Sequence, residues 1–196
     1  AMAYALGTSE YNAAMGVIVA APTAGAAGVL PGVLLAAQEE YGFTDREAVN
    51  ALITATGIGA VIATRATISG AQGGCQAEVG SGCAMAAAAL CDVMGGTARQ
   101  TTHAAAIALK NALGLACDPV AGLVEVPCIK RNGMYACMAI AAADLALAGV
   151  ESFIPPDEVI DAMYQIGCNL PACIRETAEG GLAITPTGLK AKRRLF

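Results

Sequence analysis

The chain has 196 residues, of which 56% are apolar and 14% are charged, and its formal net charge at pH 7 is −5. The apolar fraction excludes an intrinsically disordered chain, and the negative charge argues against binding to nucleic acid. Eight cysteines in a long apolar chain with helical periodicity favour a reducing, cytoplasmic location, because a secreted disulfide framework is short and rich in loops.

The first half of the chain is predicted to form helices separated by Pro/Gly turns. Residues 11–20 are predicted as an apolar helix that runs into the turn "APTAGAAG" at 21–28. A second helix is predicted over 29–40, with a proline in its first turn, where proline is tolerated. The sequence "TDRE" at 44–47 is a capping box, and the helix that it opens is expected to continue to Thr64.

The second half continues this pattern after Gly73-Gly74, which interrupts the chain just before Cys75. Helices are predicted over 75–95, 98–113, 131–147, 156–166 and 171–178, and a loop is predicted over 117–128. Four basic side chains lie within 190–196, and a basic tail of this kind is expected to be solvated or disordered.

These elements predict an all-α fold: one compact domain of tightly packed helices rich in small residues, with function at the loops that interrupt them. Residues 1–189 are assigned to this domain and 190–196 to the basic tail. A membrane-spanning alternative is weaker, because the longest uncharged run, residues 11–38, contains Pro22 and Pro31.

Five of the cysteines are interpreted first as packing residues. Cys83, Cys91 and Cys137 lie inside alanine-rich helices, where a free cysteine behaves as a small buried hydrophobe. Cys168 and Cys173 lie on either side of a proline, and they either pack or lie near a site.

The other three cysteines each lie at a break in the helical pattern. Cys75 follows a Gly-Gly pair, Cys117 follows a helix end, and Cys128 follows a proline. Without a CxxC pair, spacing alone leaves both packing and metal binding open. Zinc normally takes a fourth Cys or His ligand, and the one histidine, His103, lies within a predicted helix. Three thiolates with one open position suit an iron–sulfur cluster that acts as a Lewis acid.

Four stretches of the sequence together point to a known family. They are "AAMGVIVAAPTAGAAGVLPGVL" at 13–34, "GGCQAEVGSGCAMAAAAL" at 73–90, "GLACDPVAGLVEVPCIKRN" at 114–132 and "RETAEGGLAITPTG" at 175–188. These stretches closely resemble the catalytic α domain of the iron–sulfur-dependent L-serine dehydratases, and the resemblance extends over essentially the whole chain.

The resemblance implies a lyase that converts L-serine to pyruvate and ammonia and holds an oxygen-sensitive 4Fe-4S cluster. Cys75, Cys117 and Cys128 match the three cluster ligands, and the iron without a cysteine is where serine binds. The family also implies a β domain or β subunit as partner and a homo- or hetero-oligomer. The chain ends "KAKRRLF", without the terminal cysteine of some single-chain members, which fits the two-subunit type. An α subunit of that type carries a further helical segment ahead of Ala1, so N-terminal residues are expected to be missing.

Candidate substrate-binding residues follow from the same motifs. Thr23, Ala24 and Gly25 precede a helix start, so their amides and the hydroxyl could hold the serine carboxylate; an ordinary Pro/Gly turn is the alternative. Ser81 is a second candidate, with helix packing as its alternative. Arg131 and Asn132 follow Cys128 and either orient the substrate or the cluster or serve the start of a helix.

The base that removes the α-proton of serine is not identified by the sequence. Glu78 and Glu125 lie within the cysteine motifs and are candidates, whereas His103 lies away from them. The base could also belong to the β partner. Two alternatives to a serine lyase remain: a related iron–sulfur hydro-lyase for another hydroxy acid or amino acid, and a non-enzymatic helical scaffold or membrane protein.

Overall fold

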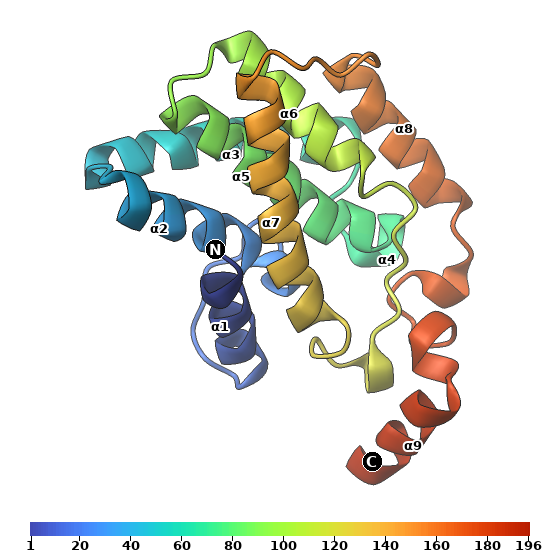
Figure 1. Cartoon of the computed structure of the whole chain (residues 1–196). Helices are drawn as coiled ribbons and strands as arrows, with labels where there is room; N and C mark the ends of the chain where they lie inside the picture. Colours follow the sequence, from blue (N-terminus) through green and yellow to red (C-terminus); the bar gives the residue numbers. More distant parts are fainter.

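The computed structural model covers residues 1–196 and contains nine α-helices and no β-strand, which confirms the predicted all-α class (Figure 1). The long helices are α1 (Met2–Ala13), α2 (Val29–Tyr41), α3 (Asp45–Arg65), α5 (Ser81–Val93), α6 (Ala98–Lys110), α7 (Cys128–Leu147), α8 (Pro156–Asn169) and α9 (Pro186–Leu195). A single turn, α4 (Gly70–Gly73), and a π-helix, η2 (Gln76–Gly80), precede α5.

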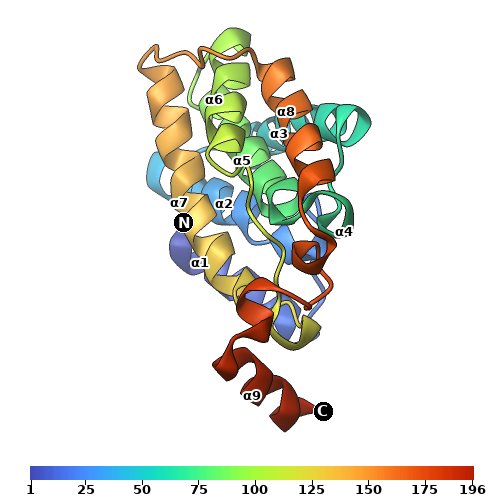
Figure 2. The same cartoon turned by 90° about the vertical axis from the view of Figure 1, so that its right-hand side faces the viewer.

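Helix α5 forms the centre of the molecule, and α2, α3, α6 and α7 pack around it (Figures 1 and 2). Its residues from Ser81 to Cys91 are all buried, and alanine is the commonest residue among them. Small side chains allow the neighbouring helices to approach closely: a Cβ added at Gly59 of α3 would lie 2.9 Å from the Met85 sulfur. Cys83 and Cys91 are 0% exposed in this core, as predicted for packing cysteines.

Two of the helix starts are fixed by capping boxes. Thr44 accepts a hydrogen bond from the Glu47 N–H, and the Glu47 carboxylate accepts one from the Thr44 N–H, so the predicted capping box of α3 is confirmed. Thr97 and Gln100 make the same reciprocal pair at the start of α6. These local signals explain why both helix starts could be predicted from sequence.

The helix predicted over 11–20 is wrong. Helix α1 ends at Ala13, and the Gly16 N–H bonds back to the Tyr11 carbonyl at 2.8 Å while Met15 takes a left-handed φ of 65°. This pairing closes a helix C-terminus. The next residues, 17–20, are non-helical because the β-branched run Val-Ile-Val favours extended backbone and a proline follows shortly after.

Two expectations for the C-terminal part also differ from the structure. The helix predicted over 171–178 is reduced to one 3₁₀ turn, η4 (Ala172–Ile174). The tail expected to be solvated or disordered is mostly exposed, but it lies in α9 and is therefore helical. Thr185 caps α9 by accepting the Gly188 N–H at 3.1 Å, and the basic residues occupy its last turns, where the helix dipole favours them. Helix α9 projects from the rest of the molecule in both views (Figures 1 and 2).

Helix α3 is the one helix long and apolar enough to cross a membrane by length and composition, and 17% of its most apolar stretch is buried. One face packs on α5, with Ala51, Ala55 and Ile62 buried there. The outer face leaves Val49 and Ile53 more than half exposed. Such a helix is weak evidence for a membrane, because long apolar helices also occur in the packed layers of soluble proteins.

Candidate active site

Five parts of the chain meet at one cavity of about 190 Å³. The cavity lies where η1 (Ala24–Ala26), η2 with the preceding Cys75, the 117–124 loop, the first turn of α7 and Glu176 come together. Its walls are formed by Ala24, Gly25, Cys75, Glu78, Val79, Cys117, Pro119, Gly122, Val124, Cys128, Arg131 and Glu176. A larger hollow of about 480 Å³ between the 18–21 segment and α2 has an almost wholly apolar wall. The smaller cavity therefore concentrates the thiols and charged groups.

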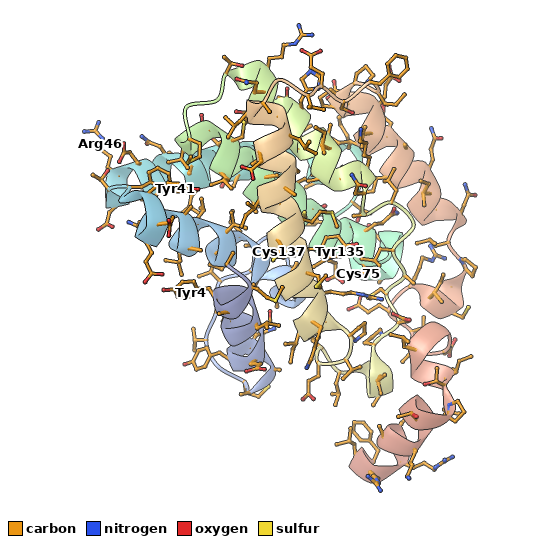
Figure 3. The ribbon with its side chains drawn as sticks, viewed as in Figure 1. Tyr4, Tyr41, Arg46, Cys75, Tyr135 and Cys137 are labelled. Atoms are coloured by element: carbon orange, nitrogen blue, oxygen red, sulfur yellow. The ribbon has the colours of Figure 1, made fainter.

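The three cysteines at helix breaks all line this cavity. Cys75 precedes the π-helix, Cys117 lies in the loop after α6, and Cys128 is the first residue of α7. Cys75 is 5% exposed and Cys117 4% exposed, and every cysteine of the chain is a free thiol. Figure 3 shows Cys75 beside α7. The remaining cysteines do not line the cavity.

The segment 174–176 holds Cys117 in place. The Cys117 N–H donates to the Ile174 carbonyl at 2.9 Å, and the Glu176 N–H donates to the Cys117 carbonyl at 2.7 Å. Glu176 has a φ of 66°, a left-handed conformation that a glutamate rarely adopts and that this pairing maintains. A residue of the C-terminal motif is thereby carried to the cavity wall.

The ion pair between Asp118 and Arg131 holds the 117–124 loop in place. The Asp118 carboxylate, 5% exposed, accepts a hydrogen bond from Arg131 at 3.1 Å and another from the Leu182 N–H at 2.8 Å. Arg131 also donates to the Ala116 carbonyl at 2.8 Å. Charge-assisted bonds of this kind are stronger than neutral ones, so they fix the loop and the first turn of α7 relative to each other. Arg131 is the one basic residue of the cavity wall.

Glu78 projects into the cavity from the π-helix, a local geometry frequent at functional sites. The Cys117 thiol donates to its carboxylate at 3.6 Å, a weak contact. Burial is the main cause that raises the pKa of Glu78, and the nearby Glu176 charge adds to it. Gly70 packs directly on the Glu78 carboxylate, so a Cβ at residue 70 would collide with it.

Burial also raises the pKa of the three thiols. The pKa of Cys75 rises to about 12 and that of Cys128 to about 11, although Arg131 opposes both shifts. The pKa of Cys117 rises as well, and its main cause is again burial. A raised pKa favours the protonated thiol, whereas a bound metal deprotonates the cysteines that ligate it.

The donor set fits an iron–sulfur cluster. No group of three or more His, Cys, Asp or Glu side chains is close enough together to hold a single metal ion. A cluster binds each thiolate at a different iron, so its ligands lie farther apart than those of a single ion. Three free thiols line one cavity, with Cys75 and Cys117 buried and Cys128 half-buried, and one arginine lies beside two of them, which is a donor set that suits a cluster.

The candidate substrate-binding residues fall into two groups. Ala24 and Gly25 line the cavity, and their N–H groups donate to no backbone carbonyl. The adjacent Thr23 hydroxyl is buried without a hydrogen-bond partner of good geometry, although it lies close enough to Glu78 to oppose the rise in the pKa of that carboxyl. Ser81 and Asn132, in contrast, do not line the cavity, since they are 0% and 1% exposed within the protein. The first group has free donors at the cavity and the second does not reach it.

The candidate bases differ in whether they line the cavity. Glu78 lines the cavity, while Glu125 is exposed and outside its wall. His103 lies on α6, where its Nδ1 accepts the Ser152 N–H at 3.1 Å. Sequence reasoning missed Asp118 and Glu176, although each lies in a motif that it quoted: Asp118 directly follows Cys117, and Glu176 belongs to "RETAEGG".

Comparison with known proteins identifies relatives over the whole chain. The family model described as "Serine dehydratase alpha chain" matches residues 1–183. The Bacillus subtilis protein "Probable L-serine dehydratase, alpha chain" is 58% identical over 100% of this chain and 65% of its own length. The Peptoniphilus asaccharolyticus "L-serine dehydratase, alpha chain" is 54% identical over 98% of this chain and 66% of its own length. A Latilactobacillus sakei protein named like the first is 54% identical over 98% of this chain and 92% of its own length. The chain thus spans about two thirds of the first two relatives, and the matches confirm the resemblance.

Proposed function

Because this chain belongs to the serine dehydratase alpha-chain family, we propose that it is the catalytic α part of a lyase that converts L-serine to pyruvate and ammonia. One observation supports this proposal above all. Cys75, Cys117 and Cys128, which are far apart in the sequence, line one cavity beside a carboxylate and a guanidinium. A packing role alone does not explain three thiols around a hollow, since the packed Cys83 lines no such hollow and these thiols share theirs with Glu78 and Arg131.

The proposed cofactor is a 4Fe-4S cluster held by Cys75, Cys117 and Cys128. When bound, the cluster would supply a Lewis acid at the iron without a cysteine, which withdraws charge from the serine hydroxyl as its C–O bond breaks. The chain's own contribution is to hold the three thiols on separate, braced segments. The Asp118–Arg131 pair braces Cys117 against the α7 turn that starts at Cys128.

The proposed substrate site lies at the cavity wall formed by the start of η1. The free N–H groups of Ala24 and Gly25 and the Thr23 hydroxyl are donors for the serine carboxylate. Donors already fixed by the fold lose little freedom on binding, so they orient the substrate at low cost. In this assignment Ser81 and Asn132 do not touch the substrate.

Glu78 is the proposed acceptor of the α-proton. Its carboxylate lies in the cavity between Gly25 and Cys117, and it pairs with no basic residue. Transfer of the α-proton to Glu78 and departure of the β-hydroxyl give aminoacrylate, which tautomerises to an imine; water then releases ammonia and leaves pyruvate. Glu125 faces away from this cavity and takes no part.

The names of the relatives, which specify an alpha chain, support a β subunit as partner. The proposed cytoplasmic location is supported by the eight free thiols of the chain. The cavity wall includes Glu176, which is exposed, so part of the site is open to a covering partner. Hetero-oligomer formation would close this opening and exclude water from the reaction.

The test is anaerobic purification with the β subunit, followed by assay of pyruvate and ammonia from L-serine and from L-threonine. We expect brown protein that bleaches in air and equal amounts of pyruvate and ammonia from L-serine. An iron-containing complex that turns over another hydroxy acid, but not L-serine, would refute the assigned substrate. A complex without iron that still turns over L-serine would refute the assigned cofactor.

A further inference from the structure

Asn132 lies between the 23–28 loop and the first turn of α7, which form two walls of the cavity. It lies on α7, about one turn after Cys128, and is 1% exposed. A buried amide side chain needs partners for two N–H donors and for its carbonyl oxygen, so each bond that it makes describes its role.

All of these groups are used within the protein. The Asn132 Nδ2 donates to the Gly25 carbonyl at 2.7 Å and to the Cys128 carbonyl at 2.9 Å. Its Oδ1 accepts the Gly28 N–H at 3.0 Å. One side chain therefore binds both ends of the 25–28 segment and the backbone of a cavity cysteine. Neither donor is left for a substrate.

No other buried side chain bonds to the 23–28 loop. The second polar link is Asn12, a half-buried residue of α1 that donates to the Ala24 carbonyl at 3.1 Å. Packing adds to the constraint at Gly28: a Cβ there would lie 3.0 Å from the Asn132 Oδ1 and would collide with the Ala5 backbone. The loop is thus pressed against α7 through Asn132 and against α1 through Gly28.

We infer that Asn132 is a positioning residue that sets the distance between the 23–25 donors and Cys128. This inference rests on the proposed function, in which those donors bind the serine carboxylate and Cys128 holds the cluster. Alignment of substrate with the reacting group is sensitive to shifts of about 1 Å, which can cost a hundredfold in rate. Loss of the Asn132 bonds frees the loop but leaves the three thiols and the Asp118–Arg131 brace unchanged.

Two variants and one control test the inference in the complete α–β complex. Asn132→Asp keeps the side-chain volume and the acceptor for Gly28, but it turns a carboxylate oxygen toward the Gly25 and Cys128 carbonyls. Asn132→Ala removes all three bonds. Asn111→Ala is the control, because Asn111 donates to the Ile107 carbonyl on α6, away from the cavity.

We expect both Asn132 variants to keep wild-type iron and sulfide content and to raise the KM for L-serine by about ten- to a hundredfold, with a smaller fall in kcat. Hydrogen exchange at the 23–28 amides, measured without substrate, is expected to rise in both variants and not in the control. This second measurement does not depend on turnover, so it tests whether Asn132 holds the 23–28 loop even if the enzyme acts on a different substrate.

Three results would overturn the inference. They are an unchanged KM together with unchanged exchange at 23–28, a fall in kcat at constant KM, and loss of iron from Asn132→Asp, which would make Asn132 a residue of cluster assembly. If Asn132→Ala fails to fold, Asn132→Asp decides the question. Absence of L-serine turnover in the wild-type complex refutes the proposed function instead. The exchange measurement then decides alone whether Asn132 holds the 23–28 loop.

Discussion

The cysteines of α5 and two cysteines of the cavity, Cys75 and Cys117, are similarly buried but have different surroundings. Cys83 is 0% exposed among alanines, and its thiol donates to the Tyr135 carbonyl at 3.3 Å. Cys117 is 4% exposed, yet its thiol faces Glu78 across a hollow that it shares with Cys75. Burial therefore does not separate a packing thiol from a functional one. The two kinds of thiol differ instead in whether charged groups and an empty volume lie beside the thiol.

The largest expected effect comes from exchanging one cysteine in each region. Cys75→Ala should lower L-serine turnover by at least about a thousandfold, because a metal centre supplies several kcal/mol of transition-state stabilisation. Cys83→Ala removes a buried sulfur in α5 and should lower stability while leaving turnover per folded complex near wild type. Pyruvate release and thermal unfolding measure the two quantities. Similar turnover in the two variants would abolish the distinction between the regions.

The carboxylates sharpen the same comparison within the cysteine motifs. Glu78→Gln should lower kcat by about 10²–10⁴-fold with normal iron content, because a positioned base contributes that factor. Glu125→Gln changes an exposed residue outside the cavity wall and should leave kcat unchanged. Steady-state kinetics with parallel iron analysis measures both. Equal kcat values for the two variants would exclude Glu78 as the proton acceptor.

A smaller effect, on the free energy of unfolding, is expected to distinguish the buried α5 from the exposed face of α3. Ala86→Leu adds volume to α5 at a residue that is 0% exposed and should lower the free energy of unfolding by about 1–3 kcal/mol. Ala60→Leu makes the same change on the exposed face of α3 and should alter that free energy by less than about 0.5 kcal/mol. Denaturant unfolding gives both values. A tolerant Ala86 would mean that the core around α5 is loosely packed.

The smallest expected effect concerns the capping box of α3. Thr44→Ala removes the acceptor for the Glu47 N–H and should cost about 1 kcal/mol of unfolding free energy. The matched change, Thr56→Ala, removes a hydroxyl that bonds within α3 to the Leu52 carbonyl, and it should be neutral or stabilising. Chemical denaturation of both variants checks this. A larger loss from Thr56→Ala would contradict the role assigned to the cap.

Sequence reasoning predicted the features that depend on local signals. The capping box at Thr44 and the interruptions beside Cys75 and Cys117 follow from neighbouring residues, so they could be predicted. The helix at 11–20 could not be corrected from composition, because the decisive bond from Gly16 to Tyr11 depends on how α1 ends. The C-terminal helix α9 was missed because its charge suggested a solvated tail.

At the site too, contacts between residues far apart in the sequence could not be predicted. The motifs pointed to Cys75, Cys117 and Cys128, and the structure describes them on one cavity; their role as cluster ligands stays a prediction. The pairing of Cys117 with residues 174–176 could not be predicted, because it joins segments more than fifty residues apart. Asn132 was proposed to bind substrate from its place in a motif, and only its three hydrogen bonds indicate a positioning role.

The central claim is that Cys75, Cys117 and Cys128 hold an iron–sulfur cluster, and anaerobic iron and sulfide analysis tests it most directly. Wild type, Cys117→Ser and the core variant Cys83→Ser should be purified side by side as the α–β complex. We predict iron and sulfide in equal amounts in the wild type and in Cys83→Ser, with a marked loss of both in Cys117→Ser. Iron content that is unchanged in Cys117→Ser would contradict the assignment.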